Sequence, residues 1–135
     1  MKRYEARTWS TPYRGEVAVH ASATIKPWVR EFLEEEPLFR RALRKAAIPD
    51  IDDLPCGAVI GSVVVREVQR MREVKPRLTK ESLALCAYPS NAYFLWRLED
   101  PKELPVPIPT AGKLNLWTLP EDIASRAKGR LRRLP

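Results

Sequence analysis

The sequence predicts an α+β fold in which a small β-barrel carries peripheral helices and a basic C-terminal helix, within one domain over residues 1–135. Residues 58–68 are dominated by β-branched side chains, which are typical of a central strand. Residues 16–21 alternate, with Val17 and Val19 on one face, as in a half-buried strand. Thirteen prolines against five glycines indicate stiff connections between short elements, which favours a barrel over a helical bundle.

Three further segments have the features of strands. Residues 4–9 carry aromatic side chains at both ends, residues 93–99 alternate, and residues 114–117 form a last short apolar strand. The proline-rich segment 101–109 is predicted to be a rigid connection between the last two strands. Residues 83–88 fit either a strand or a helical turn, because so short an apolar run has no decisive periodicity.

Helices are predicted after the second strand and at the end of the chain. Pro27 suits a first helical position, Pro37 interrupts that helix, and a second helix runs to the break at residues 49–50. The apolar stripes of both helices are expected to pack in the core: Trp28, Val29, Phe32, Leu33, Leu38, Phe39, Ala42, Leu43 and Ala46. Residues 120–122 begin the basic terminal helix, and the charged residues 71–79 predict a surface loop.

The chain is basic, with 24 Lys and Arg against 17 Asp and Glu, a formal charge of +7 and a pI of about 9.7. That balance suits a polyanionic partner, because cations displace the counterions condensed on phosphates. After Asp122 every charged side chain is positive, which fits either a polyanion contact or a solvated tail.

Membrane proteins and metalloproteins are the classes that the sequence excludes. No apolar run approaches the roughly 20 residues of a membrane-spanning helix, and the first residues lack the apolar core of a signal peptide. A cytoplasmic protein with no membrane contact is therefore expected. Cys56 and Cys86 are predicted to be reduced and buried. With His20 as the only histidine, neither a metal site nor a cofactor is expected.

Three segments, in order along the chain, follow one known pattern. Residues 2–15, KRYEARTWSTPYRG, match G-x-K-x-x-E-x-R without its glycine and then W-x-x-x-[YH]-R-G. Residues 54–61, LPCGAVIG, match P-x-G-x-x-x-G, and residues 93–117 contain L-x-x-P, P-I-P and G-x-x-x-[IL]-W in turn. The chain thus resembles the ASCH family (activating-signal-cointegrator homology), a branch of the PUA-like superfamily. The resemblance implies a PUA-like β-barrel that binds nucleic acid, RNA more than DNA, in a basic cleft.

One departure from the family concerns the start of the chain. Family members begin with a short strand and a helix before the first motif, whereas here Met1 directly precedes Lys2. The first strand and helix are therefore expected to be missing. Their loss would leave one side of the barrel open to a protein partner or to a second copy of the chain.

The first motif supplies candidate binding residues. Glu5, Arg7 and Trp9 share a face of the predicted strand, and Lys2 precedes it. Lys2 and Arg7 could meet a phosphate or a base edge, with Glu5 positioning them, because the fork of Arg binds phosphate bidentately. The alternative is a surface salt-bridge ladder of little energetic weight. The resemblance favours the binding role, because it places this motif in the ligand cleft.

Aromatic and polar side chains extend the candidate site. Trp9 and Tyr13 beside Arg7 and Arg14 suit stacking on unpaired bases, although Trp9 and Trp117 also fit a core role. His20 and Ser22 share a strand face, which fits acid–base chemistry or a structural hydrogen bond. The predicted nucleic-acid-binding residues are Lys2, Glu5, Arg7, Trp9, Tyr13, Arg14, Ser22 and Lys113.

Two alternative functions stay open. One is a small metal-independent enzyme on RNA or modified nucleosides, ribonuclease or amidohydrolase-like, with Lys2, Glu5, Tyr13 and His20 as its catalytic candidates. The amidohydrolase relatives carry Thr three residues after the motif Lys, where this chain has Glu5, which argues against transferring their nucleophile. The other is a protein-interaction adaptor that uses the open side of the barrel.

Overall fold

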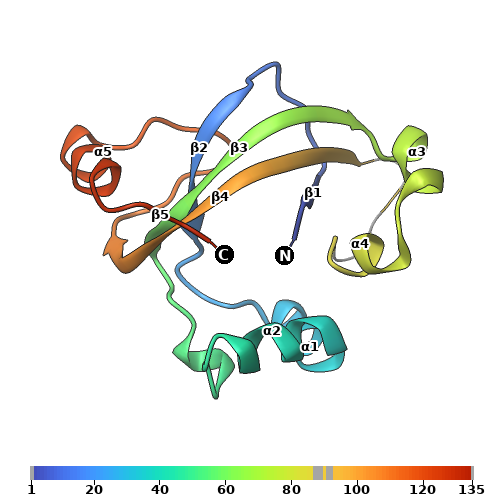
Figure 1. Ribbon diagram of the computed structural model, residues 1–135, viewed down its shortest axis with the longest axis horizontal. Coiled ribbons are helices and arrows are strands. Elements are labelled where there is room, and N and C mark those ends of the chain that lie inside the picture. The colour runs from blue at the N-terminus through green and yellow to red at the C-terminus, as the bar shows by residue number, and fades with distance from the viewer. Residues whose placement is uncertain (1, 87–89, 91–92, 135) are drawn as a thin grey trace.

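The computed structural model describes residues 2–86, 90 and 93–134. Its centre is an antiparallel sheet with the strand order β1-β4-β3-β2, in which β5 also pairs with β4 (Figure 1). The strands are β1 (Tyr4–Arg7), β2 (Gly15–Ala21), β3 (Ala58–Arg70), β4 (Phe94–Pro109) and β5 (Arg132–Arg133). The β-branched run lies in β3, between β2 and β4, which confirms it as a central strand.

Helices surround the sheet, which confirms the α+β class (Figure 1). They are α1 (Pro27–Glu35), α2 (Pro37–Lys45), α3 (Met71–Val74), α4 (Lys80–Ala84) and α5 (Glu121–Lys128), with 3-10 turns at Ile51–Asp53 and Lys75–Arg77. Pro27 begins α1 as predicted, and Pro37, predicted to interrupt the helix, begins α2, because a first helical position needs no N–H donor. No helix in the described part of the chain is long and apolar enough to cross a membrane.

The sheet is open and does not close into the predicted β-barrel. β1 pairs with residues 94–97 of β4, while β2 pairs with residues 58–65 of β3. Residues 67–70 of β3 pair with the same residues of β4, 94–97, from the other side. β1 and β2 therefore lie at opposite ends of an arched sheet, and no pairing between them is present in the residues described (Figure 1).

The proline-rich segment is also different from its prediction, because it continues β4 as far as Pro109. The ladder with β3 is irregular twice in this stretch, after Glu99 and after Glu103. Three prolines fall inside these irregular stretches: Pro101, Pro105 and Pro107. A proline is tolerated at such a bulge because no ladder hydrogen bond requires its missing N–H.

The buried core lies on the sheet and not under α1 and α2. One cluster joins the sheet to α5, and the other lies where β4 meets α3; their members are Val59, Leu104, Ile108, Ile123 and Ala127, and Met71, Val74, Cys86 and Leu95. α1 and α2 contribute no buried residue, and Trp28 is 49% exposed. The prediction that their apolar stripes form the core is therefore wrong. The two helices pack on each other, with the Phe32 and Phe39 rings 5.4 Å apart.

Local corrections follow from the same packing. The predicted loop 71–79 contains α3, and Met71 has no exposed surface. The run 83–88 begins within α4 and its residues 87–88 lie outside the described chain. Residues 114–117 have no strand pairing, with bends at residues 114–116, and Cys56 is exposed. The terminal helix ends before Gly129, and the chain then returns to the sheet as β5.

Candidate functional site

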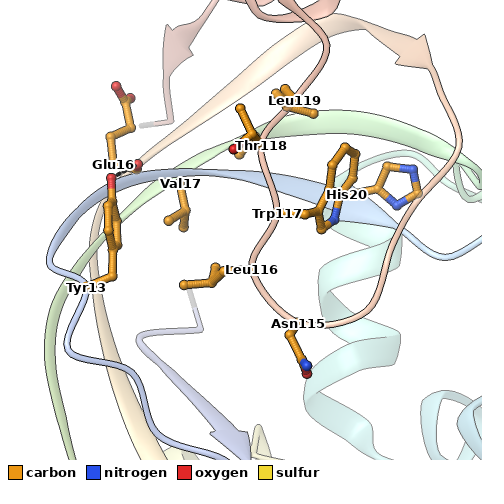
Figure 2. Close-up of a pocket in the computed structure, with 10 residues that line it drawn as sticks. Tyr13, Glu16, Val17, His20, Asn115, Leu116, Trp117, Thr118 and Leu119 are labelled. Carbon is orange, nitrogen blue, oxygen red and sulfur yellow. Dashed lines mark hydrogen bonds between the residues drawn. The ribbon is translucent and has the colours of Figure 1, made fainter.

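A hollow of about 450 Å³ lies between β2 and the loop that follows β4. We name it the β2 hollow. Its lining comes from β2 and the turn before it and from the loop after β4: Tyr13, Glu16, Val17, Ala18, His20, Asn115, Leu116, Trp117, Thr118 and Leu119. Figure 2 shows the loop running past β2, with Leu116 and Val17 pointing toward each other.

Aromatic rings form two opposite walls of the β2 hollow (Figure 2). On one side the Tyr13 ring lies over Gly15, and its hydroxyl donates to the backbone oxygen of Glu16 at 2.8 Å. On the other side Trp117 meets His20 edge to face, with 6.0 Å between the ring centroids. Trp117 is only partly buried, so its predicted core role gives way to a position in the wall.

His20 is held in place by the loop that it faces. Its Nε2 lies 2.8 Å from the backbone oxygen of Thr110. Because a carbonyl oxygen only accepts, Nε2 must donate, which leaves Nδ1 with a lone pair in the neutral ring. A Cβ built on Gly112 would lie 2.6 Å from Cε1 of His20, so the loop passes against the ring only because residue 112 has no side chain.

Gly112→Ala is therefore expected to displace either the loop or the His20 ring. The extra methyl group should lower the free energy of unfolding by about 1–3 kcal/mol, the usual cost of overpacking. Urea unfolding measures the change. In a His20→Ala background the same glycine substitution should cost little, and an equal cost in both backgrounds would contradict the contact.

Glu16 is the centre of a polar network above β2. Its Oε1 accepts from Lys102 Nζ at 2.7 Å and from Ser62 Oγ at 2.8 Å. The hydrogen bond from Lys102, followed by that from Ser62, lowers the pKa of Glu16. The hydrogen bond to Glu16 in turn raises the pKa of Lys102. Lys102 also lies 3.5 Å from Asp100, which pairs with Arg133 of β5 at 3.4 Å. The C-terminal strand is thus linked to the wall of the β2 hollow.

The network predicts a pH dependence for stability. The pKa of Glu16 in the folded state lies below its ordinary value of 4.5. The ionised Glu16 therefore stabilises the fold fully above pH 4.5, and this stabilisation is lost as the pH falls through the folded-state pKa. Glu16→Gln is expected to lower the urea midpoint slightly at pH 7 and to match the wild-type protein once Glu16 is protonated. A difference that persists in acid would assign the effect to some other cause.

Lys2, just before β1, comes together with Glu5 and Arg7 of β1, as the sequence suggested. Glu5 pairs with Lys2 at 2.6 Å and with Arg7 at 3.1 Å. Lys2 also lines a second hollow of about 370 Å³, here the β1 hollow, whose lining is Lys2, Arg3, Tyr4, Val63, Arg97, Leu98, Glu99, Asp100 and Pro101. Val63 is the cross-strand partner of Val17, which lines the β2 hollow. The two hollows therefore adjoin across one strand pair.

The other predicted binding residues lie outside both sets of lining residues. Trp9 packs edge to face on Trp96 with 4.7 Å between centroids. Arg14 donates to the backbone oxygens of Thr11 and Tyr13 and so braces the turn before β2. Ser22 follows the end of β2, where its carbonyl accepts from Gly57, and Lys113 is exposed in the loop. Of the predicted set, Tyr13 lines the β2 hollow and Lys2 lines the β1 hollow, and the catalytic candidate His20 joins Tyr13.

Several lining residues were missed by the sequence reasoning. Glu16 alternates with His20 on the polar face of the predicted strand, which was an available signal. Asn115 and Leu116 give none, since the sequence predicts a strand over residues 114–117. Their loop has no regular pairing, and Asn115 has a φ of 61°. Among the described residues, no group of three or more His, Cys, Asp or Glu side chains could hold a metal ion.

Comparison with known proteins relates the chain to one of them. No family model matches it. Over 131 residues, 95% of this chain, it is 29% identical to activating signal cointegrator 1 of Homo sapiens. The same protein of Mus musculus is 28% identical over 131 residues. The chain spans about a fifth of the length of these relatives (21%). This homology supports a relation to the ASCH family.

Proposed function

We propose that this relative of activating signal cointegrator 1 is a nucleic-acid-binding module of the PUA-like ASCH type, with a preference for single-stranded RNA over DNA. The observation that carries the proposal is the aromatic-walled β2 hollow beside the cation-lined β1 hollow. An unpaired base occupies the first, and the sugar–phosphate backbone follows the second.

The β2 hollow has the features that an unpaired base requires. Tyr13 and Trp117 present ring faces or edges from opposite sides, and aromatic side chains contribute about 1–3 kcal/mol per stacked base. Asn115 and Thr118 bring polar groups to the same space. RNA is the favoured ligand because sequence-dependent RNA recognition mostly targets unstacked bases, with the 2′-hydroxyl as an added contact.

Cations lie where the backbone of such a ligand would leave the base. Lys2, Arg3 and Arg97 line the β1 hollow, and both of its carboxylates are paired: Glu99 with Arg97 at 2.9 Å, and Asp100 with Arg133 at 3.4 Å. Lys113 is exposed and lies two residues before Asn115, which lines the β2 hollow. With a net charge of +7 on the chain, phosphate contacts should dominate the affinity.

Fluorescence anisotropy with labelled single-stranded RNA, single-stranded DNA and duplex DNA of about ten nucleotides tests the proposal. Binding should be tightest for the RNA and should weaken steeply between about 50 and 200 mM salt. Lys113→Ala should reduce the salt slope by about one, while Lys80→Ala, on α4 at the other end of the sheet, should leave it unchanged.

Absence of binding to all three ligands, or binding that ignores salt, would contradict the proposal. The same RNA samples are then run on a denaturing gel. Intact RNA is the expected result, and shortened RNA that disappears with His20→Ala would identify a nuclease instead.

A further inference from the structure

We infer that the last part of the described chain is a second phosphate-binding surface, which extends the cation-lined β1 hollow. We name it the C-terminal basic surface and define it by its five cations: Arg126, Lys128, Arg130, Arg132 and Arg133. The inference rests on the proposed function and deepens it, because it adds where the backbone of the RNA continues beyond the two hollows.

The segment that carries these cations is held on the sheet and is not a solvated tail. Ile123 and Ala127 of α5 are 6% and 7% exposed in a core cluster, and Leu131 packs against the same cluster. The chain then pairs with β4 as β5, and the N–H of Leu134 donates to the backbone oxygen of Pro101 at 3.2 Å. The sequence left a polyanion contact and a solvated tail open. The packing favours the contact, because an anchored backbone has less conformational entropy to lose on binding.

The C-terminal basic surface borders the β1 hollow. Asp100 and Pro101 line that hollow, and Arg133 Nε lies 3.4 Å from Asp100 Oδ1. β5 pairs with the next two residues of β4, 102–103, and runs beside β4 from α5 (Figure 1). Two residues of a strand span only about 7 Å. A phosphate backbone that leaves the β1 hollow at Pro101 therefore meets Arg132 and Arg133 next.

Two cations of this surface have no carboxylate partner in the described part of the chain. Arg130 and Arg132 are exposed, and neither forms an ion pair with a described residue. Arg133 pairs with Asp100, yet its side chain is 80% exposed. In contrast, Lys102 in the middle of β4 gives its charge to Glu16 at 2.7 Å. The positive charge that can meet an external anion is therefore found on the C-terminal basic surface.

Helix electrostatics account for only part of this charge. Arg126 and Lys128 lie in the last turn of α5, where cations stabilise the negative end of the helix. Arg130 and Arg132 come after the helix has ended at Gly129 and have no such role. Four of the five cations are arginine, whose planar fork binds a phosphate through two hydrogen bonds. Phosphate is therefore the ligand chemistry that suits this surface.

The test uses Arg130→Ala/Arg132→Ala with labelled single-stranded RNAs of about 6 and 12 nucleotides, which lie within the range of single-strand site sizes. The shorter RNA fills the two hollows, and the longer RNA also reaches the C-terminal basic surface. With the longer RNA, the salt slope should fall by about 1.4, because each single-strand phosphate contact contributes about 0.7. Binding should be roughly tenfold weaker at about 0.1 M salt. The shorter RNA should bind both proteins within about twofold.

Two further variants control for net charge and for charge type. Arg72→Ala/Lys80→Ala removes the same charge from exposed positions on α3 and α4, at the other end of the sheet, and should leave the salt slope unchanged (Figure 1). Arg130→Lys/Arg132→Lys keeps the charge and should restore the slope and most of the affinity. All of these side chains are exposed, so the urea midpoints should match that of the wild-type chain.

The outcomes separate this inference from the function on which it depends. An unchanged salt slope for Arg130→Ala/Arg132→Ala with the longer RNA overturns the C-terminal basic surface and leaves binding in the hollows in place. An equal loss in Arg72→Ala/Lys80→Ala also overturns it, because net charge alone would then explain the effect. A loss as large with the shorter RNA overturns the extension beyond the β1 hollow. No binding of any oligonucleotide overturns both proposals.

Discussion

Gly61→Ala is expected to destabilise the chain by about 3 kcal/mol or more, which would be a large fraction of the stability of a domain of this size. Gly61 lies in β3 opposite Glu103 of β4. A Cβ at this position would lie 2.1 Å from the backbone oxygen of Lys102, far inside any real contact distance. That oxygen belongs to a paired strand and not to the end of a flexible side chain, so β3 and β4 must separate to admit one methyl group.

Urea unfolding compares Gly61→Ala with Gly129→Ala. A Cβ on Gly129 meets nothing within 4 Å, and its φ of −84° suits alanine. The control should be neutral or slightly stabilising, because alanine restricts the unfolded chain. Equal urea midpoints for the two variants would show that the two central strands approach less closely than described.

Trp117→Ala is expected to weaken single-stranded RNA binding by about tenfold or more, because it removes one aromatic wall of the β2 hollow. The ring lies 6.0 Å from His20 and across the hollow from Tyr13. Trp117→Phe keeps an aromatic face and should restore most of the affinity. Both substitutions remove part of the packing of Trp117, but only Trp117→Ala removes the aromatic face. A higher affinity of Trp117→Phe therefore indicates that the ring stacks on a base.

Trp28→Ala is the matched control for Trp117→Ala. Trp28 is 49% exposed on α1 and is not a lining residue of either hollow. Its removal should leave the affinity unchanged in anisotropy titrations. A similar loss with Trp28→Ala, or an unchanged affinity with Trp117→Ala, would move the ligand away from the β2 hollow.

Local sequence signals predicted the elements whose formation depends on neighbouring residues. Alternation indicated β2, the β-branched run indicated β3, and prolines marked the starts of α1 and α2. The ion pairs of Glu5 with Lys2 and Arg7 were also foreseen, because their spacing places them together on one short segment. These features need only strand and helix periodicity, which a single chain displays.

The predictions were wrong for elements whose packing depends on residues distant in the sequence. The segment 101–109 did not look like a strand, because its prolines are tolerated only where the ladder with β3 is irregular. The stripes on α1 and α2 looked like core faces, yet the sheet packs against α5 and α3 instead. An amphipathic stripe indicates that a helix has an apolar face but does not say what covers it.

The sequence by itself determined a basic α+β chain with a β-branched central strand, a Lys2–Glu5–Arg7 cluster and a resemblance that homology supports. Only the tertiary structure decided that the sheet stays open and that the candidate site divides into two hollows. The physical reason is sequence separation. Tyr13 and His20 line the same hollow as Trp117, about a hundred residues later, because a loop that has no periodicity fits against His20 where residue 112 is glycine.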